Sequence, residues 1–220
     1  MKKNIYLIFS LLLFFSPLFV FGHQPNFVQN KSVVFDSEPT LSKAYYGTLN
    51  NQPTVYNIYS TSTFDMYVNL LSPDIPETLK DFTITIRDDK KNIIKTVSSN
   101  SSEWIRWYEE FGGDWYLKGP EFKEQFQPGM YTISVQNQTN TGRYVLAIGE
   151  IESFPINQFT NTITQLYRIK TLFFNEPWYG IYYGIIGKYL FLSSIILVFI
   201  LVVIISITIR IIRKRYINTN

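Results

Sequence analysis

The strongest pattern along the chain is an uncharged, almost wholly apolar run from Tyr189 to Ile209. Leu, Ile, Val and Phe make up most of this run, and Ser and Thr supply nearly all the rest. As a helix the run would be about 32 Å long, which matches the hydrocarbon thickness of a bilayer. Helices of soluble proteins alternate apolar and polar faces, and this run does not. It therefore predicts one transmembrane helix over residues 189–209.

A different pattern, with a period of two residues, fills the stretch between Ser32 and Glu150. One run, for example, places apolar side chains at positions 64, 66, 68 and 70. Such alternation is typical of strands that are buried on one face. Polar turn segments separate the runs at intervals of about ten residues, which favours an antiparallel sandwich of short strands. The candidate strands are residues 32–36, 44–49, 54–60, 64–70, 82–86, 93–98, 131–135 and 144–148.

Several of these strand segments occur in an order that is seen in a known family. They are Gly47-Thr48-Leu49, Tyr56-Asn57-Ile58-Tyr59, Met66-Tyr67-Val68-Asn69-Leu70, Phe82-Thr83-Ile84-Thr85-Ile86-Arg87-Asp88, Pro128-Gly129-Met130-Tyr131-Thr132-Ile133-Ser134-Val135 and Gly142-Arg143-Tyr144-Val145-Leu146. In these motifs the chain resembles the bacterial pre-peptidase C-terminal domain, a small jelly-roll-like β-sandwich found beside secreted hydrolases and in surface proteins. Some members of that family are thought to bind calcium or polysaccharide. Because this sequence matches no ligand motif of the family, the resemblance implies a fold and no site residues.

Two departures from the family pattern stand out. The glycine that follows the family's aspartate turn is missing, with Asn92 the nearest residue, and a long insertion runs from Trp104 to Phe126. The whole chain also resembles a set of membrane-anchored prokaryotic proteins with a His-Gln-Pro terminus and a Glu-Glu-Phe-Gly-Gly-Asp segment, which implies an architecture and no activity. We therefore expect a mainly β chain: an antiparallel, jelly-roll-like β-sandwich over residues 23–152 with an insertion at 104–126, then an amphipathic helix and one transmembrane helix.

The amphipathic helix is expected in the segment 153–188, where the apolar period changes to three or four residues. The recurring positions are Ile156, Phe159, Ile163, Leu166, Ile169 or Lys170, and Phe173. Ser153 is the expected amino-terminal cap, and Pro155 would lie in the first turn. The pattern leaves three neighbours open for the apolar stripe: the sandwich, the lipid headgroup layer and a partner helix.

The flanks of the transmembrane run predict how the chain sits in a membrane. Aromatic residues collect just before it, as they do at membrane interfaces; they are Trp178, Tyr179, Tyr182, Tyr183 and Tyr189. A basic cluster follows it in residues 210–220, formed by Arg210, Arg213, Lys214 and Arg215. Since positive residues stay on the cytoplasmic side, we expect a single-pass protein of the cell membrane with a cytoplasmic carboxyl terminus and an extracytoplasmic domain.

The amino terminus carries a second apolar run, preceded by Lys2 and Lys3. This run ends at Val20-Phe21-Gly22, and we interpret residues 1–22 as a signal peptide. Cleavage after Gly22 would give a type I membrane protein whose mature chain begins at His23. An uncleaved signal anchor is the alternative, and it exports the same domain.

Composition excludes several classes of function. In residues 22–187, 13 Lys and Arg face 17 Asp and Glu, a net charge of −4, so the expected exported domain lacks the basic surface needed to bind nucleic acid. The chain has no cysteine, which excludes disulfides, thiolate metal sites and cysteine nucleophiles.

Aromatic and acidic residues gather in the insertion at 104–126. The candidate ligand-binding residues are Trp104, Trp107, Trp115, Glu109, Glu110, Asp114 and Glu121. Aromatic faces flanked by carboxylates suit a polysaccharide, because rings stack on sugar C–H faces and carboxylates accept from hydroxyls. The alternative is a connection that folds over one end of the sandwich and buries its own aromatics. The acids lack the regular spacing of a calcium loop, and adjacent Glu109 and Glu110 point to opposite faces of an extended chain, so they cannot form a glycosidase pair.

His23 is the only histidine in the chain. At a mature terminus its α-amine and ring would together bind copper, but that chemistry requires a second histidine. The competing interpretation is a disordered terminal residue. Serine hydrolase chemistry lacks a suitably placed base, so we expect no catalytic site and no required cofactor, with copper or calcium as minor alternatives.

The predicted function is a non-catalytic, membrane-anchored binding or accessory module that contacts an envelope or membrane protein. One alternative is a carbohydrate-binding module that uses the segment from Trp104 to Phe122. A second alternative is a metal-binding protein that uses His23. The short tether to the bilayer favours partners close to the membrane surface.

Overall fold

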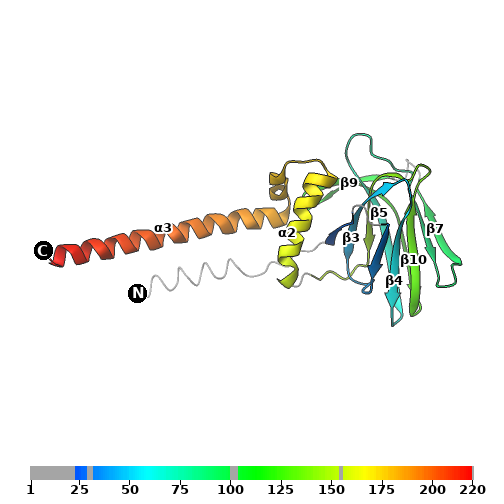
Figure 1. Ribbon diagram of the computed structural model, residues 1–220, viewed down its shortest axis with the longest axis horizontal. Helices are drawn as coiled ribbons and strands as arrows, with labels where there is room; N and C mark the ends of the chain where they lie inside the picture. Colours follow the sequence, from blue (N-terminus) through cyan, green and yellow to red (C-terminus); the bar gives the residue numbers. More distant parts are fainter. Residues whose placement is uncertain (1–22, 29–31, 100–103, 154–155, 220) are drawn as a thin grey trace.

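A computed structural model describes residues 23–28, 32–99, 104–153 and 156–219. The predicted signal peptide and Pro155 therefore lie outside the described residues. The described chain forms a β-sandwich from which a long helix extends (Figure 1). The strands are β1 (Gln24–Phe27), β2 (Val33–Asp36), β3 (Lys43–Asn50), β4 (Thr54–Ser60), β5 (Phe64–Pro73), β6 (Thr83–Arg87), β7 (Ile93–Ser98), β8 (Ile105–Glu109), β9 (Asp114–Phe126), β10 (Gly129–Gln136) and β11 (Thr141–Ile148).

Two sheets make up the sandwich. The six-stranded sheet has the order β1-β3-β11-β5-β9-β8, and the five-stranded sheet has the order β2-β4-β10-β6-β7. Most neighbours are antiparallel, as predicted, but β1 pairs with β3 and β2 pairs with β4 in parallel. The parallel pairs arise because the chain crosses between the two sheets at β1, β2 and β3, so no tight hairpin links the strands that pair.

The predicted alternation places one face of each sheet in a common core. Along β5, the side chains of Phe64, Met66, Val68 and Leu70 are all buried in it. Tyr56 and Tyr144 meet across the core with their hydroxyl oxygens 3.0 Å apart, so each buried hydroxyl has a partner. The full cluster is Val28, Tyr45, Leu49, Tyr56, Ile58, Phe64, Met66, Val68, Leu70, Phe82, Ile84, Ile86, Phe122, Phe126, Ile133, Val135, Tyr144, Leu146 and Ile148.

The segment 104–126, expected as an insertion, is part of one of the two sheets. This segment forms β8 and β9, a hairpin at the edge of the six-stranded sheet, and β9 pairs with β5 along most of its length. The register of that pairing shifts between Asn69 and Leu71 of β5. Because such an irregularity changes which residues share a face, the period of two is interrupted and the strand is hard to recognise in the sequence.

Helices cover the outer face of the six-stranded sheet. They are η2 (Ile156–Gln158), α2 (Phe159–Arg168), the π-helical turn η3 (Ile169–Phe173) and η4 (Trp178–Tyr183). Ile169 and Phe173 pack on Tyr46, Leu71 and other residues of the sheet in a second apolar cluster. The sandwich is therefore a neighbour of the apolar stripe.

The predicted helix start at Ser153 is wrong. The α-helix begins at Phe159, and Gln158 at its amino end makes no capping hydrogen bond through its side chain. The Ser153 carbonyl instead accepts a hydrogen bond of 2.5 Å from the Gln24 side chain. Beside it, the Ser42 amide donates to the Ile151 carbonyl, so the chain before the helix is held in an extended form against the sheet.

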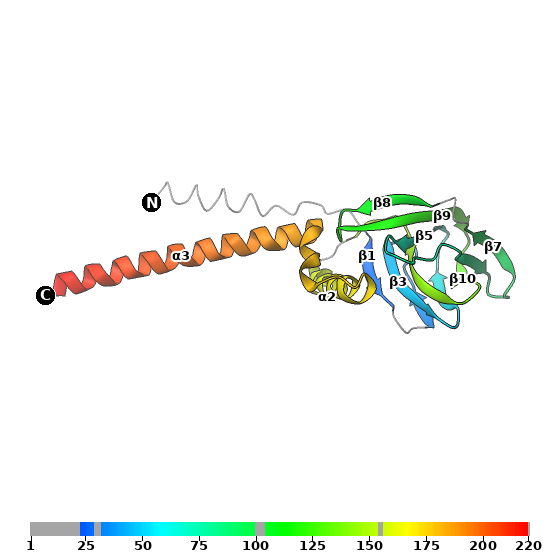
Figure 2. The same cartoon turned by 90° about the horizontal axis from the view of Figure 1, so that it is seen from above.

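The final element, α3 (Ile185–Thr219), is long and apolar enough to cross a membrane. It begins before the predicted span and continues through the basic residues at 210–215. Its apolar portion extends away from the sandwich and is not buried against other described parts of the chain (Figures 1 and 2).

Candidate functional site

The turn of the β8–β9 hairpin lies at the end of the sandwich from which α3 departs. Glu109 shapes this turn, because its carboxylate accepts hydrogen bonds from the backbone amides of Phe111 (2.8 Å) and Gly112 (2.7 Å). The Gly113 amide donates to the Glu109 carbonyl at 2.9 Å, and Gly113 has a φ of 76°, which glycine adopts without strain. The sequence Glu-Glu-Phe-Gly-Gly-Asp thus encodes a compact turn.

This turn contacts the start of α3 through the backbone. The Ile185 amide donates to the Glu110 carbonyl at 2.9 Å. A Cβ atom added at Gly113 would collide with the Gly184 nitrogen, and one added at Gly184 would collide with the Phe111 carbonyl. Both glycines are therefore required for the two segments to approach this closely. We call this contact, formed by residues 109–114 and 184–186, the hairpin–helix junction.

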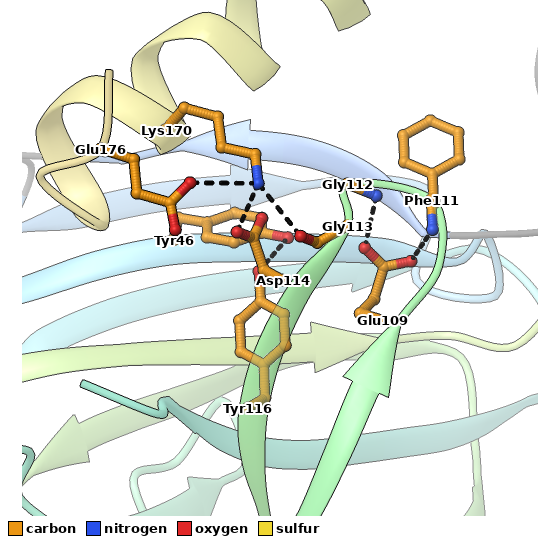
Figure 3. A network of polar contacts seen from close by, with 9 residues as sticks. All are labelled: Tyr46, Glu109, Phe111, Gly112, Gly113, Asp114, Tyr116, Lys170 and Glu176. Carbon is orange, nitrogen blue, oxygen red and sulfur yellow. Dashed lines mark hydrogen bonds and ion pairs between the residues drawn. The ribbon is translucent and has the colours of Figure 1, made fainter. Parts of the chain in front are cut away.

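An ion pair inside the protein ties the junction to η3. The Nζ atom of Lys170 lies 2.5 Å from Asp114 Oδ1, and the two side chains are 0% and 2% exposed. Lys170 also donates to the Gly113 carbonyl at 3.3 Å and lies 3.5 Å from the Glu176 carboxylate (Figure 3). Three acceptors thus surround a lysine that has no access to water.

Burial shifts the pKa values of the carboxyl groups in this region. It raises the pKa of Asp114 to about 7, although the ion pair with Lys170 acts in the opposite direction. Burial also raises the pKa of Glu109, while the hydrogen bonds from Gly112 and Phe111 lower it. Since Glu109 is engaged by the turn and Asp114 by Lys170, both act as structural groups in this arrangement.

A cavity of about 330 Å³ lies beside the junction. Its lining includes Asp74, Tyr108, Trp115, Glu176 and Tyr183. The Asp114 Oδ2 atom accepts no hydrogen bond from the described residues, but that atom is buried and is not reached by solvent.

The three candidate tryptophans do not form one sugar-binding surface. Trp104 packs against the sandwich core, and its indole N–H donates to the Lys80 carbonyl at 3.0 Å. Trp107 and Trp115 are 40% and 43% exposed. Trp107 is paired with Tyr116 and Trp115 with Tyr108, so the two tryptophans lie on opposite faces of the hairpin. The structure therefore does not bring the three candidate tryptophans together on one face.

The surroundings of Trp115 and Glu121 also differ from a ligand site. The guanidinium of Arg106 lies 4.0 Å from the Trp115 ring centre and covers one of its faces. Glu121 lies in the middle of β9, where it accepts a hydrogen bond from the Tyr67 hydroxyl and pairs with Lys118 at 3.4 Å. The acids of the segment are therefore divided between the turn and the middle of the strand.

His23 is an ordered residue next to β1. Its Nδ1 atom is hydrogen-bonded to the Ser42 hydroxyl, and burial, with Lys118 nearby, lowers its pKa. Within the ranges that the structure describes, no group of three His, Cys, Asp or Glu residues could hold a metal ion. The described side chains thus supply no completed copper or calcium site around His23 or the hairpin.

Sequence reasoning missed Lys170 as the partner of Asp114. The signal was weak but present, because this lysine sits beside Ile169 within the apolar stripe of the helix. A charged residue on such a stripe needs a buried partner. The sequence alone could not indicate which of the many carboxylates supplies it.

Comparison with solved structures gave several matches. No protein-family model and no curated protein matches the chain. One similar structure is the pre-peptidase C-terminal domain of a collagenase from Bacillus anthracis, with 14% identity, coverage of 59% of this chain and 97% of that one, and a TM-score of 0.33. Another is a β-glucosidase from Paenibacillus barengoltzii, with 11% identity, coverage of 59% of this chain and 14% of that one, and a TM-score of 0.28.

Proposed function

We propose that the protein is a non-catalytic accessory module that is anchored in a cell membrane and binds another protein of the same membrane or envelope. Its sandwich would carry the binding surface. The observation that carries this proposal is the hairpin–helix junction, which fixes the sandwich to the first residues of α3. The proposal does not depend on any ligand of the sandwich.

Fixed attachment of the sandwich to α3 restricts the partners that such a module can reach. A domain on a long flexible linker samples a large volume, whereas a domain held at the membrane surface has a high effective concentration only for neighbours in that surface. Here the Ile185–Glu110 hydrogen bond and the Lys170–Asp114 ion pair leave no flexible linker between sandwich and helix. A partner in the same membrane is therefore favoured over a soluble one.

The charges at the ends of α3 support an extracytoplasmic sandwich. The basic cluster that includes Arg210 and Arg213 lies in the last turns of the helix, beyond its apolar stretch. By the positive-inside rule this end would stay in the cytoplasm, which would place the sandwich outside it. The apolar run at residues 5–21 agrees with export of the domain.

The test is co-purification of the full chain from its native membranes in a mild detergent, using a tag at the carboxyl terminus. We expect a second membrane or envelope protein in stoichiometric amount. Inserting a flexible Gly-Ser segment between Gly184 and Ile185 should reduce its recovery, because the sandwich is then no longer fixed. The control carries the same insert after Arg215 and should retain the partner.

Two results would contradict the proposal. Absence of any stoichiometric partner after chemical cross-linking in intact membranes would remove the accessory role. Equal recovery of the partner with both inserts would show that fixed attachment of the sandwich to α3 has no part in binding.

A further inference from the structure

The helix α2 has a second apolar face that no other described residue covers. Its first face, with Leu166 and the buried Thr162, points to the sandwich. Away from that face, Phe159 and Tyr167 are 47% and 50% exposed, and Ile163 is partly exposed between them. These three residues are spaced by four, so they form one stripe along the helix. We call Phe159, Ile163 and Tyr167 the outer stripe.

The position of α2 relative to α3 indicates what the outer stripe meets. In both views α2 lies at the end of the sandwich from which α3 departs, and Figure 1 shows its axis steeply crossing that of α3. Leu166 of α2 packs with Ile186, and Leu190 packs against the same cluster. Because Leu190 is only about 8 Å along α3 from its first residue, α2 lies at the level of the first turns of the anchor.

Exposed aromatic side chains also lie close to the first turns of α3. On η4, Trp178, Tyr179 and Tyr183 are exposed, and the ring of Tyr182 lies 6.2 Å from that of Phe191 in α3. Amphipathic rings of this kind collect in the headgroup layer of a bilayer. Neither α2 nor η3 contains a carboxylate that would resist approach to the membrane surface.

We infer that the outer stripe of α2 rests in the headgroup layer of the bilayer that α3 spans. Leu172 of η3, which is 47% exposed, extends the apolar surface available at this end. An interfacial helix buries its apolar face in this layer while its polar face remains in water. The opposite flank of α2, with Asn161 and Gln165, instead lines a polar cleft of about 550 Å³. The membrane thus contacts the sandwich through α2 as well as through α3.

This inference rests on the proposed membrane anchoring, and the experiment separates the two. Because the chain has no cysteine, single cysteines can carry an environment-sensitive fluorophore in the full chain in lipid nanodiscs. The test positions are Phe159→Cys and Tyr167→Cys. The controls are Asn161→Cys on the cleft side of α2, Thr96→Cys on β7, and Val198→Cys in the middle of α3.

We expect the labels at 159 and 167 to be quenched by lipids that carry a nitroxide near the headgroup. Their quenching by aqueous iodide should be several-fold weaker than that of labels at 161 and 96. The label at 198 should respond only to nitroxides deep in the acyl chains. Unchanged thermal unfolding of each labelled variant relative to the unlabelled chain confirms that the fold is intact.

Three other outcomes would contradict the inference or the membrane anchoring. Labels at 159 and 167 that iodide quenches as strongly as the label at 96 would overturn the inference, while a lipid-embedded 198 would leave the anchoring intact. Protection from iodide without quenching by lipid would also overturn it, because a second copy or another protein would then cover the stripe. Exposure of 198 to iodide would overturn the anchoring itself.

Discussion

At the scale of single residues, Lys170 and Asp114 determine how the sandwich joins the helices. Removing both charges from water costs more than their attraction returns in many proteins, so such a pair is a weak source of stability. Removing one partner is different, because the other charge is left buried. We expect Lys170→Met to lower the free energy of unfolding by about 3–5 kcal/mol. Denaturant unfolding of the full chain in detergent measures this loss.

The matched control is the double variant Lys170→Met with Asp114→Leu, which removes both charges. It should recover most of the loss, since an apolar pair of similar volume needs no compensation. A single variant as stable as the parent would mean that the Asp114 carboxyl is not held inside the protein by Lys170.

The protonation of Asp114 gives a second prediction at this scale. Its pKa is raised from 3.8 to about 7, so the folded state holds this proton over a range in which the unfolded state has lost it. The contribution of Asp114 to stability is therefore greatest below about pH 4 and falls as the pH rises through about 7. Titration of ¹³C-labelled aspartate by NMR, with Asp114→Asn to assign the signal, should give a midpoint near 7. A midpoint near 4 would mean that the ion pair with Lys170 outweighs the effect of burial and would contradict this prediction.

A third prediction concerns Lys91, in the turn where the family pattern has a glycine. The positive φ of 68° falls on Lys91, one residue before Asn92, and Asn92 itself donates through its amide to Asp88 at 2.7 Å. A residue other than glycine is strained at this positive φ. Lys91→Gly should therefore raise the free energy of unfolding by about 1 kcal/mol. Lys90→Gly in the same turn is the control and should lower it slightly, because that residue has no positive φ. Equal effects of the two changes would refute this account of the turn.

At the scale of elements, the hairpin–helix junction depends on two glycines from distant segments. We expect Gly113→Ala and Gly184→Ala each to lower stability, by about 1–3 kcal/mol, because the added Cβ meets backbone atoms that cannot move independently. Hydrogen exchange of the Ile185 amide should accelerate in both variants, since its bond to Glu110 is weakened. The control is Gly112→Ala, where the added Cβ would lie 3.1 Å from Glu109 Oε2 and 3.2 Å from Asp114 Oδ2, so it meets side-chain atoms rather than backbone and requires a smaller shift. Slow exchange at Ile185 in all three variants would count against the junction.

Elements with a regular period were predictable from the sequence. The apolar run at 189–209 and the alternation in β5 each depend on local pattern, and both are confirmed. The hairpin of β8 and β9 was not predictable, because a shift in register breaks its period and its aromatics suggested a ligand site. The start of α2 was missed because Ser153 is held by Gln24, far away in the sequence.

The residues of the junction were harder to predict than the strands. The acidic segment containing Glu109 and Asp114 was singled out as a candidate ligand site, with a connection folded over one end of the sandwich as the other interpretation. Its real partners, Lys170 and the amide of Ile185, are separated from it by more than fifty residues and meet it only through packing. Pairing over such distances depends on the whole fold, which local patterns do not contain.

At the scale of the whole molecule, the consequence is a sandwich that is held at one orientation to its anchor. The helix α2 and the first turns of α3 lie at the same end of the sandwich, so a membrane around α3 would meet the sandwich on one defined face (Figure 2). The opposite end, which includes β7, would then point away from the membrane. The distance between β7 and α3 therefore reports whether the sandwich is held in one orientation relative to α3.

That distance is the final prediction. Spin labels at Thr96→Cys and Val198→Cys in nanodiscs should give a narrow distribution by pulsed electron paramagnetic resonance, because the hairpin–helix junction ties the sandwich to the start of α3. A Gly-Ser insert between Gly184 and Ile185 should broaden the distribution, since it separates the hairpin turn from the helix. The same insert after Arg215 lies beyond both labels and should leave the distribution narrow. A broad distribution in the parent chain would show a mobile sandwich and would remove the basis for a partner fixed at the membrane surface.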